Sequence, residues 1–317
     1  MRVLITRLLP DAVIAAARAR FDVTLRELGR PMSAEEAAAA LRDYDAVLPT
    51  LGDAFGTSAF DAVDAPRCRL LANFGVGYNH IDAAAAKAKG IAVTNTPGAV
   101  TDATADIAMM LILMSARRAS EGERLVRAGQ WTGWHPVQML GQHVTGKTLA
   151  IIGMGRIGKA IARRAHFGFG MRIVFFNRSP VADAGMAAVQ AATVAEAMAA
   201  GDFVVTAVPG GPATRHIIGA GALAAMQPHA HLVNIARGDV VDEAALIAAL
   251  TERRIAGAGL DVYEREPVVP EALKALNNVT LLPHLGTATS EVRTAMGMMA
   301  VENLLAFAEG RALINPV

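Results

Sequence analysis

The sequence predicts an α/β protein built from two doubly wound, parallel-sheet domains. Short apolar runs alternate with alanine-rich helical stretches along the chain, and a turn-rich break at residues 95–98 separates two blocks of this alternation. The chain has 317 residues, more than one domain usually holds. Hydrophobic residues make up 53% of it and charged residues 19%, which excludes a disordered protein because enough apolar surface is available to form cores.

The first block contains five expected strands separated by helices. The strands are expected at residues 3–5, 21–25, 46–48, 70–72 and 91–93. A helix over 11–20 begins at Pro10-Asp11, and the Ser33–Glu36 capping box opens a helix that extends to Leu41. A third helix is expected over 80–89 and ends at Gly90.

The second block begins with a long helix expected over 102–120 and an irregular loop at 129–136. The apolar run Ile107–Met114 inside this helix is far shorter than the roughly 20 residues of a membrane span, so we expect a buried helix. Six strands follow, and the last helix is expected over 290–309. These strands are expected at residues 148–152, 172–176, 203–208, 231–235, 257–262 and 279–282.

Charge and cysteine content exclude several classes of protein. Lys and Arg total 30 against 29 Asp and Glu, so the net charge of +1 lacks the basic footprint of a nucleic-acid binder. The N-terminal apolar run is too short for a signal peptide. The one cysteine, Cys68, excludes an intramolecular disulfide and a cysteine metal cluster. We therefore expect a cytoplasmic protein that binds neither nucleic acid nor membrane and holds no metal.

A glycine-rich turn at residues 153–158 predicts a dinucleotide-binding site. The G-x-G-x-x-G pattern alone is weak, but here it follows an expected strand and opens an expected helix over 159–165. Gly153 permits the tight turn, Gly155 lets the backbone approach a pyrophosphate, and Gly158 lets helix and strand pack closely. The alternative is a glycine-rich turn that binds nothing.

The residues after the next strand predict which dinucleotide is preferred. An NAD-preferring site usually has Asp or Glu there, whereas this chain has Asn177, Arg178 and Ser179. A guanidinium pairs with a 2′-phosphate that a carboxylate would repel. We therefore expect NADP(H) to be preferred and NAD(H) to bind more weakly. The alternative is that Arg178 is an exposed arginine without a ligand.

Ionisable residues follow three later strands. Arg237, Glu266 and His284 come after the expected strands at 231–235, 257–262 and 279–282, and Asp261 stands at the end of the second. Because the carboxyl ends of parallel strands line the ligand crevice, we expect these side chains to converge where a nicotinamide lies. His229 and His231 lack a third ligand type, so we interpret them as the start of a strand rather than a metal pair.

Together these motifs resemble the D-isomer-specific 2-hydroxyacid dehydrogenase family over essentially the whole chain. The shared motifs occur in the same order and are Gly75-Val76-Gly77, the turn at 153–158, the segment 234–239, the segment 261–267 and Pro283-His284. Residues 101–106 and 129–134 are most similar to the glyoxylate/hydroxypyruvate reductase branch. Asp106 and Asn79 replace the Glu and Asp of many relatives, and we expect neither change to remove activity.

The resemblance implies NADPH-dependent reduction of small 2-keto acids, such as glyoxylate and hydroxypyruvate, to D-2-hydroxy acids. It implies a flavodoxin-like substrate-binding domain at 1–99 and 287–317 and a Rossmann cofactor domain at 100–286. His284 would be the general acid, Glu266 would favour its protonated form, and Arg237 would bind the substrate carboxylate and polarise the keto group. Implied cofactor contacts are Thr104, Gly153, Met154, Gly155, Arg156, Ile157, Gly158, Asn177, Arg178, Ser179, Val208, Pro209, Thr214, Ile235, Ala236, Asp261 (toward the nicotinamide amide) and Gly286.

The resemblance also implies substrate contacts and an assembly. The N–H groups of Val76 and Gly77 would bind the substrate carboxylate in a backbone nest, and Leu51 would line the pocket. Relatives form two-fold dimers through their cofactor domains, so we expect a homodimer in which Trp134 reaches the partner's active-site mouth. The alternative is that Trp131 and Trp134 pack against their own helix.

Two other functions stay open at this point. One is reduction of a bulkier acid such as 2-ketogluconate or phenylpyruvate. The other, from a different class, is a dinucleotide-sensing binding protein. Such proteins have extended termini for partners, whereas we expect no such arm here, because residues 314–317 follow soon after the last helix.

Overall fold

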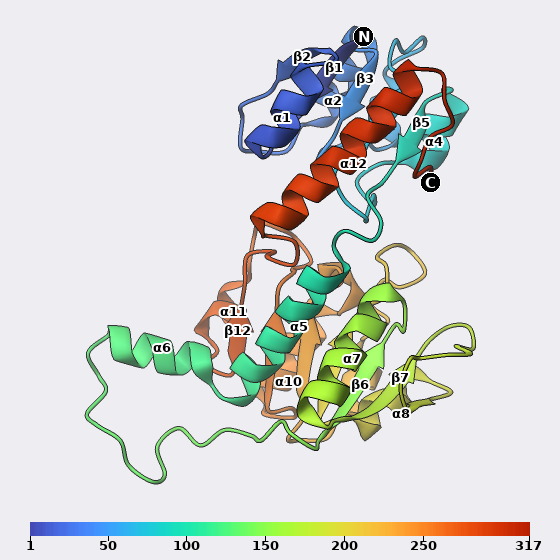
Figure 1. The fold of residues 1–317 in the computed structure, drawn as a ribbon. Coiled ribbons are helices and arrows are strands. Elements are labelled where there is room, and N and C mark those ends of the chain that lie inside the picture. Colours follow the sequence, from blue (N-terminus) through green and yellow to red (C-terminus); the bar gives the residue numbers. More distant parts are fainter. The chain divides into compact units, whose positions relative to one another are not determined.

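The computed structural model describes residues 1–317 and divides the chain into two compact units (Figure 1). Unit 1 consists of Met1–Val100 and Thr287–Val317, and unit 2 of Thr101–Gly286.

Unit 1 is built on a five-stranded sheet in which all strands are parallel. The strands are β1 (Arg2–Ile5), β2 (Asp22–Leu25), β3 (Ala46–Leu48), β4 (Leu70–Ala72) and β5 (Ala92–Thr94). Their order is β2-β1-β3-β4-β5, the flavodoxin-like order that the sequence predicts. The order reverses direction between β1 and β3, and the loops after these two strands therefore form the topological switch point of the unit.

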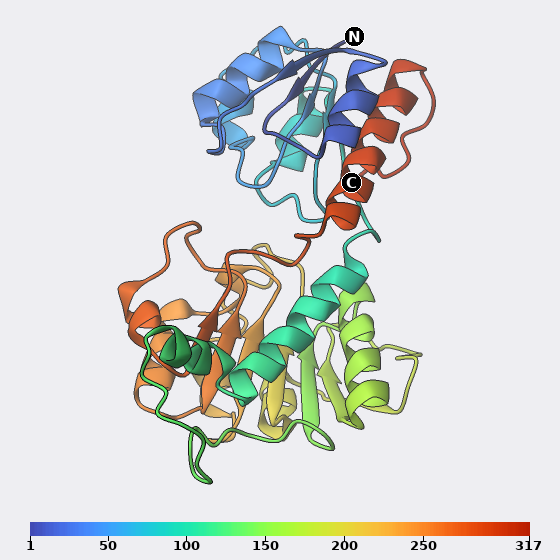
Figure 2. The same ribbon diagram turned by 60° about the vertical axis from the view of Figure 1, so that its left-hand side comes forward.

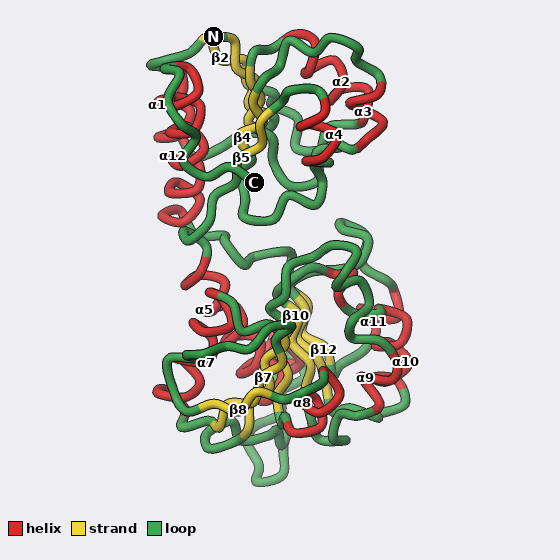
Figure 3. Tube along the Cα trace, turned by 90° about the vertical axis from the view of Figure 1, so that its right-hand side faces the viewer, coloured by secondary structure: helices red, strands yellow, loops and turns green.

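Helices cover both faces of this sheet (Figure 3). α1 (Asp11–Arg18) and α12 (Ser290–Ala308) pack on one face, whereas α2 (Ala34–Asp43), α3 (Thr57–Asp61) and α4 (Ala83–Ala88) pack on the other. The predicted capping box is present, because Ser33 Oγ accepts from the Glu36 N–H while Glu36 accepts from the Ser33 N–H. α3 was not predicted from the sequence.

Unit 2 is built on a seven-stranded parallel sheet. The strands are β6 (Thr148–Ile152), β7 (Arg172–Phe176), β8 (Ala188–Gln190), β9 (Phe203–Thr206), β10 (His231–Asn234), β11 (Gly257–Leu260) and β12 (Val279–Leu281). Their order is β12-β11-β10-β9-β6-β7-β8, so the direction of winding reverses between β6 and β9, as in a Rossmann domain.

The helices of unit 2 lie in two layers (Figure 3). α5 (Thr101–Ala116) and α7 (Arg156–Phe169) cover one face, and Figure 2 shows α5, in teal, lying across the strands. The other face is covered by α8 (Val194–Ala200), α9 (Ala220–Ala224), α10 (Glu243–Thr251) and α11 (Glu271–Ala275). α5 buries Ala108, Leu111 and Ile112, as expected for a core helix. None of the helices is both long enough and apolar enough to span a membrane.

The continuous helix expected over 102–120 is wrong. α5 ends at Ala116, Arg118 takes a left-handed conformation with φ 54°, and α6 (Ala119–Arg127) begins anew. α5 is buried against the sheet, whereas α6 has no buried residue. The apolar pattern of α5 therefore does not continue past the break, and Arg118 pairs with Glu121 in the first turn of α6.

The expected number of strands in unit 2 was also too low. The seventh strand, β8, is a three-residue edge strand whose Val189 is largely exposed, so it lacks the apolar run by which buried strands are found. Expected strands 203–208, 231–235 and 257–262 were too long at their carboxyl ends. The chain turns there to form the loops described below.

Candidate active site

The glycine turn joins β6 to α7 and leaves room for a ligand. A Cβ on Gly158 would lie 2.1 Å from the Gly153 carbonyl oxygen, so only glycine permits this close packing. Gly153 has φ 106°, and a Cβ there would lie 2.8 Å from the Ala207–Val208 backbone. Gly155 meets no atom within 4 Å, and α7 begins there without a side-chain cap. Free N–H groups of the helix thus face open space, which fits a dinucleotide pyrophosphate.

The residues after β7 lie beside this turn. Asn177 Oδ1 accepts from the Met154 N–H at 3.2 Å, and Asn177 Nδ2 donates to the Ser179 carbonyl at 2.9 Å. Gln190 Nε2 on β8 donates to the Asn177 and Ser179 carbonyls, both at 3.2 Å. Arg178 is exposed and makes no hydrogen bond or ion pair. Sequence reasoning missed Gln190, because it lies on the strand that was not predicted.

Other expected cofactor contacts gather at the same edge of the sheet. Thr214 Oγ1 donates to the Pro209 carbonyl at 2.6 Å, which holds the loop after Val208. Ile235 and Ala236 follow β10 and are buried. Thr104 Oγ1 donates to the Gly286 carbonyl at 3.1 Å. The expected cofactor contacts therefore lie on loops and helix starts at the carboxyl edge of one sheet.

The three expected catalytic residues follow three neighbouring strands. Arg237 follows β10, Glu266 follows β11 and His284 follows β12. His284 Nδ1 and Glu266 Oε2 are 2.8 Å apart, and Glu266 Oε1 accepts from the Tyr263 N–H at 3.1 Å. Burial raises the pKa of Glu266, but the His284 hydrogen bond and nearby positive charge outweigh burial and hold this pKa below its usual range.

Arg237 is half-buried on a turn that Asn234 organises. Asn234 Oδ1 accepts from Thr206 Oγ1 at 2.6 Å and from the Ala236 N–H at 3.0 Å, while Asn234 Nδ2 donates to the Arg237 carbonyl at 2.9 Å. Burial lowers the pKa of Arg237, and the negative charges of Glu266 and Asp239 oppose that effect. The turn therefore presents a guanidinium beside the Glu266 carboxylate.

Asp261 fixes the turn that carries His284. Its two carboxylate oxygens accept from the Leu285 N–H at 2.6 Å and the Gly286 N–H at 2.8 Å, and its carbonyl accepts from the His284 N–H at 2.9 Å. His284 has φ 56°, a conformation that costs a residue with a side chain on the order of 1 kcal/mol. Asp261 is buried, and the positioning of this strained turn is a role that the sequence did not reveal.

A contact between loops was also missed. Glu264 Oε1 lies 3.0 Å from Arg215 Nη2 and 3.1 Å from His216 Nε2. The His216 N–H donates to the Asp239 carbonyl at 2.7 Å. The loop that ends at Thr214 is thereby joined to the loop that carries Glu266.

In unit 1, the segment Gly75–Gly77 has its carbonyl groups bound, while the N–H groups of Val76 and Gly77 are free. Asn73 Nδ2 donates to the Gly75 and Gly77 carbonyls at 3.0 and 3.1 Å, and Asn95 Nδ2 donates to the Val76 carbonyl at 2.9 Å. No protein acceptor binds the N–H groups of Val76 and Gly77. These two N–H groups can therefore bind an anion. Sequence reasoning missed Asn73 and Asn95, which resemble ordinary turn residues.

The last two expected contacts are exposed apolar side chains. Leu51 is 37% exposed on a loop of unit 1, and Trp134 is 79% exposed on the loop after α6 in unit 2. Trp131 donates through Nε1 to Gln138 within its own loop and is 54% exposed. Neither tryptophan is buried against the helix before it.

Comparisons with known proteins agree with this arrangement. A family model described as D-isomer specific 2-hydroxyacid dehydrogenase, NAD binding domain, matches residues 109–286. A glyoxylate reductase of Thermococcus gammatolerans is 45% identical over 315 residues, which covers 98% of this chain and 93% of the relative. A glyoxylate reductase of Korarchaeum cryptofilum is 43% identical and covers 100% of this chain and 95% of the relative.

A solved structure extends the likeness to both units. The NADPH-dependent glyoxylate/hydroxypyruvate reductase of Sinorhizobium meliloti, solved with NADP and malonate, is 36% identical with a TM-score of 0.89 and covers 100% of this chain and 96% of that chain. The chain therefore belongs to the D-isomer-specific 2-hydroxyacid dehydrogenase family. Within this family it falls in the glyoxylate reductase branch, as the sequence motifs predicted.

Proposed function

We propose that the protein reduces small 2-keto acids, glyoxylate and hydroxypyruvate among them, to D-2-hydroxy acids with NADPH. The observation that carries this proposal is the His284–Glu266 pair, 2.8 Å apart, with Arg237 on the neighbouring strand end and the glycine turn in the same unit. The names of the glyoxylate reductases among its relatives support the substrate class.

Each residue has a separate part in the proposed mechanism. A bound nicotinamide supplies the hydride. Glu266 occupies Nδ1 of His284, which leaves Nε2 to deliver a proton to the keto oxygen. Arg237 pairs with the substrate carboxylate and polarises the keto group. In unit 1, the free N–H groups of Val76 and Gly77 offer a second place where a carboxylate can bind.

The test is a panel of 2-keto acids assayed by NADPH and NADH oxidation, with His284→Ala beside the wild type. We expect turnover of short keto acids, and we expect His284→Ala to keep its NADPH affinity while losing about 10²-fold or more in kcat. His143→Ala, an exposed histidine, is the control. Wild-type turnover in His284→Ala would contradict the assignment. Tight cofactor binding without turnover of any keto acid would favour the dinucleotide-sensing alternative.

Cofactor preference rests on Arg178, which is exposed, unpaired and next to Asn177 beside the glycine turn. We expect Arg178→Ala to weaken NADPH binding about tenfold or more and leave NADH binding nearly unchanged, because only the 2′-phosphate uses this guanidinium. Arg163→Ala, another exposed arginine without a partner, is the matched control. Equal losses for both cofactors would show that Arg178 is structural.

We also propose a homodimer in the cytoplasm. α6 has no buried residue, and the loop after it exposes Trp131, Trp134, Val137 and Leu140 by half or more of their surface. Apolar surface of this extent is costly in a monomer, and a second copy that covers it accounts for the exposure. Sedimentation should show a dimer, and Trp134→Ala should shift relative activity toward longer keto acids. A monomer, or an unchanged substrate profile, would contradict the proposal.

A further inference from the structure

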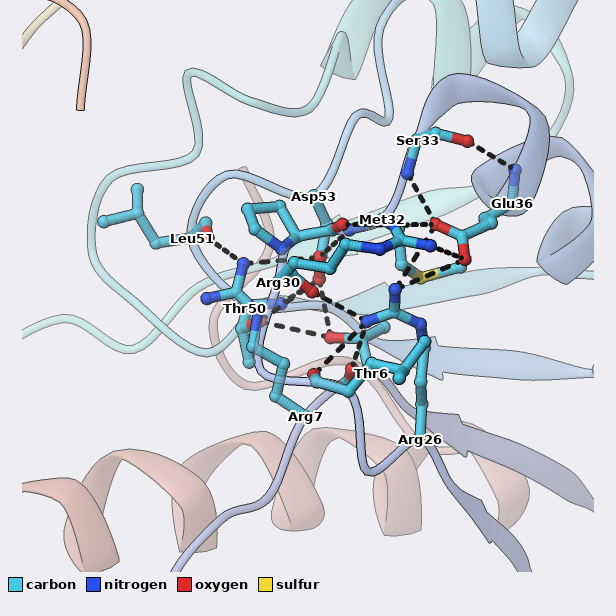
Figure 4. A network of polar contacts seen from close by, with 12 residues as sticks. Thr6, Arg7, Arg26, Arg30, Met32, Ser33, Glu36, Thr50, Leu51 and Asp53 are labelled. Carbon is cyan, nitrogen blue, oxygen red and sulfur yellow. Dashed lines mark hydrogen bonds and ion pairs between the residues drawn. The ribbon is translucent and has the colours of Figure 1, made fainter. Parts of the chain in front are cut away.

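The switch point of unit 1 holds a network of buried and half-buried polar groups (Figure 4). The loop after β1 contributes Thr6 and Arg7, and the loop after β3 contributes residues 50–53. In doubly wound sheets, ligands bind in the crevice beyond the strand ends at this reversal of strand order. The network therefore lies where the fold itself predicts ligand contact.

Asp53 is the centre of this network, and its side chain is fully buried. Oδ1 accepts from the Met32 N–H at 2.8 Å, while Oδ2 accepts from the Thr50 N–H at 2.8 Å and from Thr6 Oγ1 at 2.6 Å. Thr50 Oγ1 also lies 3.2 Å from Oδ2. A buried carboxylate costs free energy unless it is fully bonded, and here it bonds three separate chain segments.

Arg7 joins this centre to the exposed tip of the loop (Figure 4). Its Nη2 donates to the Leu51 carbonyl at 2.6 Å and lies 3.6 Å from Asp53 Oδ1. Gly52, at φ 89°, makes the tight turn between the two, and a Cβ there would lie 3.2 Å from Pro31. The backbone of Leu51 is thus held from both sides, while its side chain stays 37% exposed.

The same loop is joined to the anion-binding segment of unit 1. Thr50 pairs with Phe74 in a parallel bridge, and the Phe74 N–H donates to the Pro49 carbonyl at 2.9 Å. Phe74 directly precedes the segment Gly75–Gly77, in which the N–H groups of Val76 and Gly77 are free. The position of Leu51 is therefore fixed relative to the groups that can bind a carboxylate.

We propose that Arg7 and Asp53 are positioning residues that hold Leu51 at the switch point and thereby set how large a 2-keto acid side chain the enzyme accepts. This inference rests on the proposed reduction of 2-keto acids. A substrate anchored through its carboxylate at Val76 and Gly77 directs its remaining atoms outward, and a fixed Leu51 limits their bulk.

The test compares Arg7→Met with Arg7→Lys and with Arg30→Met as the matched control. Methionine keeps the aliphatic bulk of Arg7 and removes its donors, whereas lysine restores one donor to the Leu51 carbonyl. Arg30 belongs to the neighbouring part of the network, pairs with Glu36 and does not bind the 50–53 loop. Hydrogen exchange of residues 47–56 reports the loop directly, and KM and kcat are measured for keto acids of increasing chain length.

We expect Arg7→Met to exchange faster at residues 50–53, to raise KM for glyoxylate about tenfold with kcat within twofold, and to gain relative activity on branched keto acids. Arg7→Lys should recover part of each effect, and Arg30→Met should show none. Unchanged hydrogen exchange would overturn the proposal that Arg7 holds the 50–53 loop. Faster exchange with an unchanged substrate profile would overturn the proposal that this hold sets the accepted substrate size. A wild type that reduces no keto acid would overturn the proposed function, and size selection would fall with it. The exchange data would still decide whether Arg7 clamps the loop.

Discussion

Replacing Asp261 with asparagine tests whether a buried carboxylate sets the position of His284. Asparagine has the same shape, but its amide can accept only one of the two N–H groups that Asp261 now accepts, from Leu285 at 2.6 Å and Gly286 at 2.8 Å. The amide nitrogen would then face a backbone N–H. The turn that holds His284 at φ 56° would lose one of its three hydrogen bonds to Asp261.

The size of the effect follows from these contacts. A hydrogen bond to a charged group contributes about 1.5–3 kcal/mol, and the strained conformation of His284 costs on the order of 1 kcal/mol. If about 2 kcal/mol is lost from the arrangement in which His284 protonates the substrate, kcat falls about 30-fold. Cofactor affinity should change by less than about threefold, because the glycine turn and Arg178 are untouched.

Steady-state kinetics with a short keto acid and fluorescence titration of NADPH measure the two quantities separately. Asp45→Asn is the control, because Asp45 also accepts a backbone N–H, from Arg2 at 2.7 Å, but lies in unit 1 far along the chain from His284. If cofactor affinity falls as much as kcat, Asp261 acts by contacting the nicotinamide amide. A folded variant with wild-type kcat would refute the positioning role.

Two further predictions concern other buried polar groups. Asn73→Leu removes the side-chain donor that binds the Gly75 and Gly77 carbonyls, so the loop should turn its free N–H groups away and KM for keto acids should rise about tenfold. An unchanged NADPH affinity is the check. Burial lowers the pKa of His231 from 6.5 to about 4. The contribution of this residue to the free energy of unfolding is therefore fully present above pH 6.5 and is lost as the pH falls toward 4. In urea unfolding, the free energy of unfolding of His231→Asn should fall by up to about 3 kcal/mol less than that of the wild type between neutral and acid pH. An equal pH dependence in the two proteins would contradict this.

Much of the fold could be predicted because the strands are buried and therefore apolar. The expected strands 148–152 and 172–176 match β6 and β7 residue for residue, since each contains a continuous run of four apolar residues next to turn residues. β8 was not predicted, because an edge strand of three residues with an exposed Val189 contains no such run. The break at Arg118 was not predicted, because helix-forming residues stand on both sides of it.

Some residues of the candidate site could likewise be named from the sequence, and others could not. The proposed catalytic residues, such as His284 and Glu266, stand in recognisable motifs and could be named from the sequence. Residues that hold backbone in place could not, because Asn73 and Asp53 act through carbonyl and N–H groups of distant segments. No local pattern reports a contact between Asp53 and Met32, since only the folded chain brings them together.

The division of the chain also has a consequence for biosynthesis. Unit 1 uses both ends of the polypeptide, and α12 supplies Ala300, Val301 and Leu304 to a core shared with β1 and β3. A ribosome that has released residues 1–100 has therefore made a sheet on which one apolar face carries α1 but still lacks α12. Unit 2 is contiguous and can mature while the remainder is being translated. Unit 1 begins to emerge before unit 2 but is completed after it, and the part of its sheet that awaits α12 is what a chaperone would meet on the nascent chain.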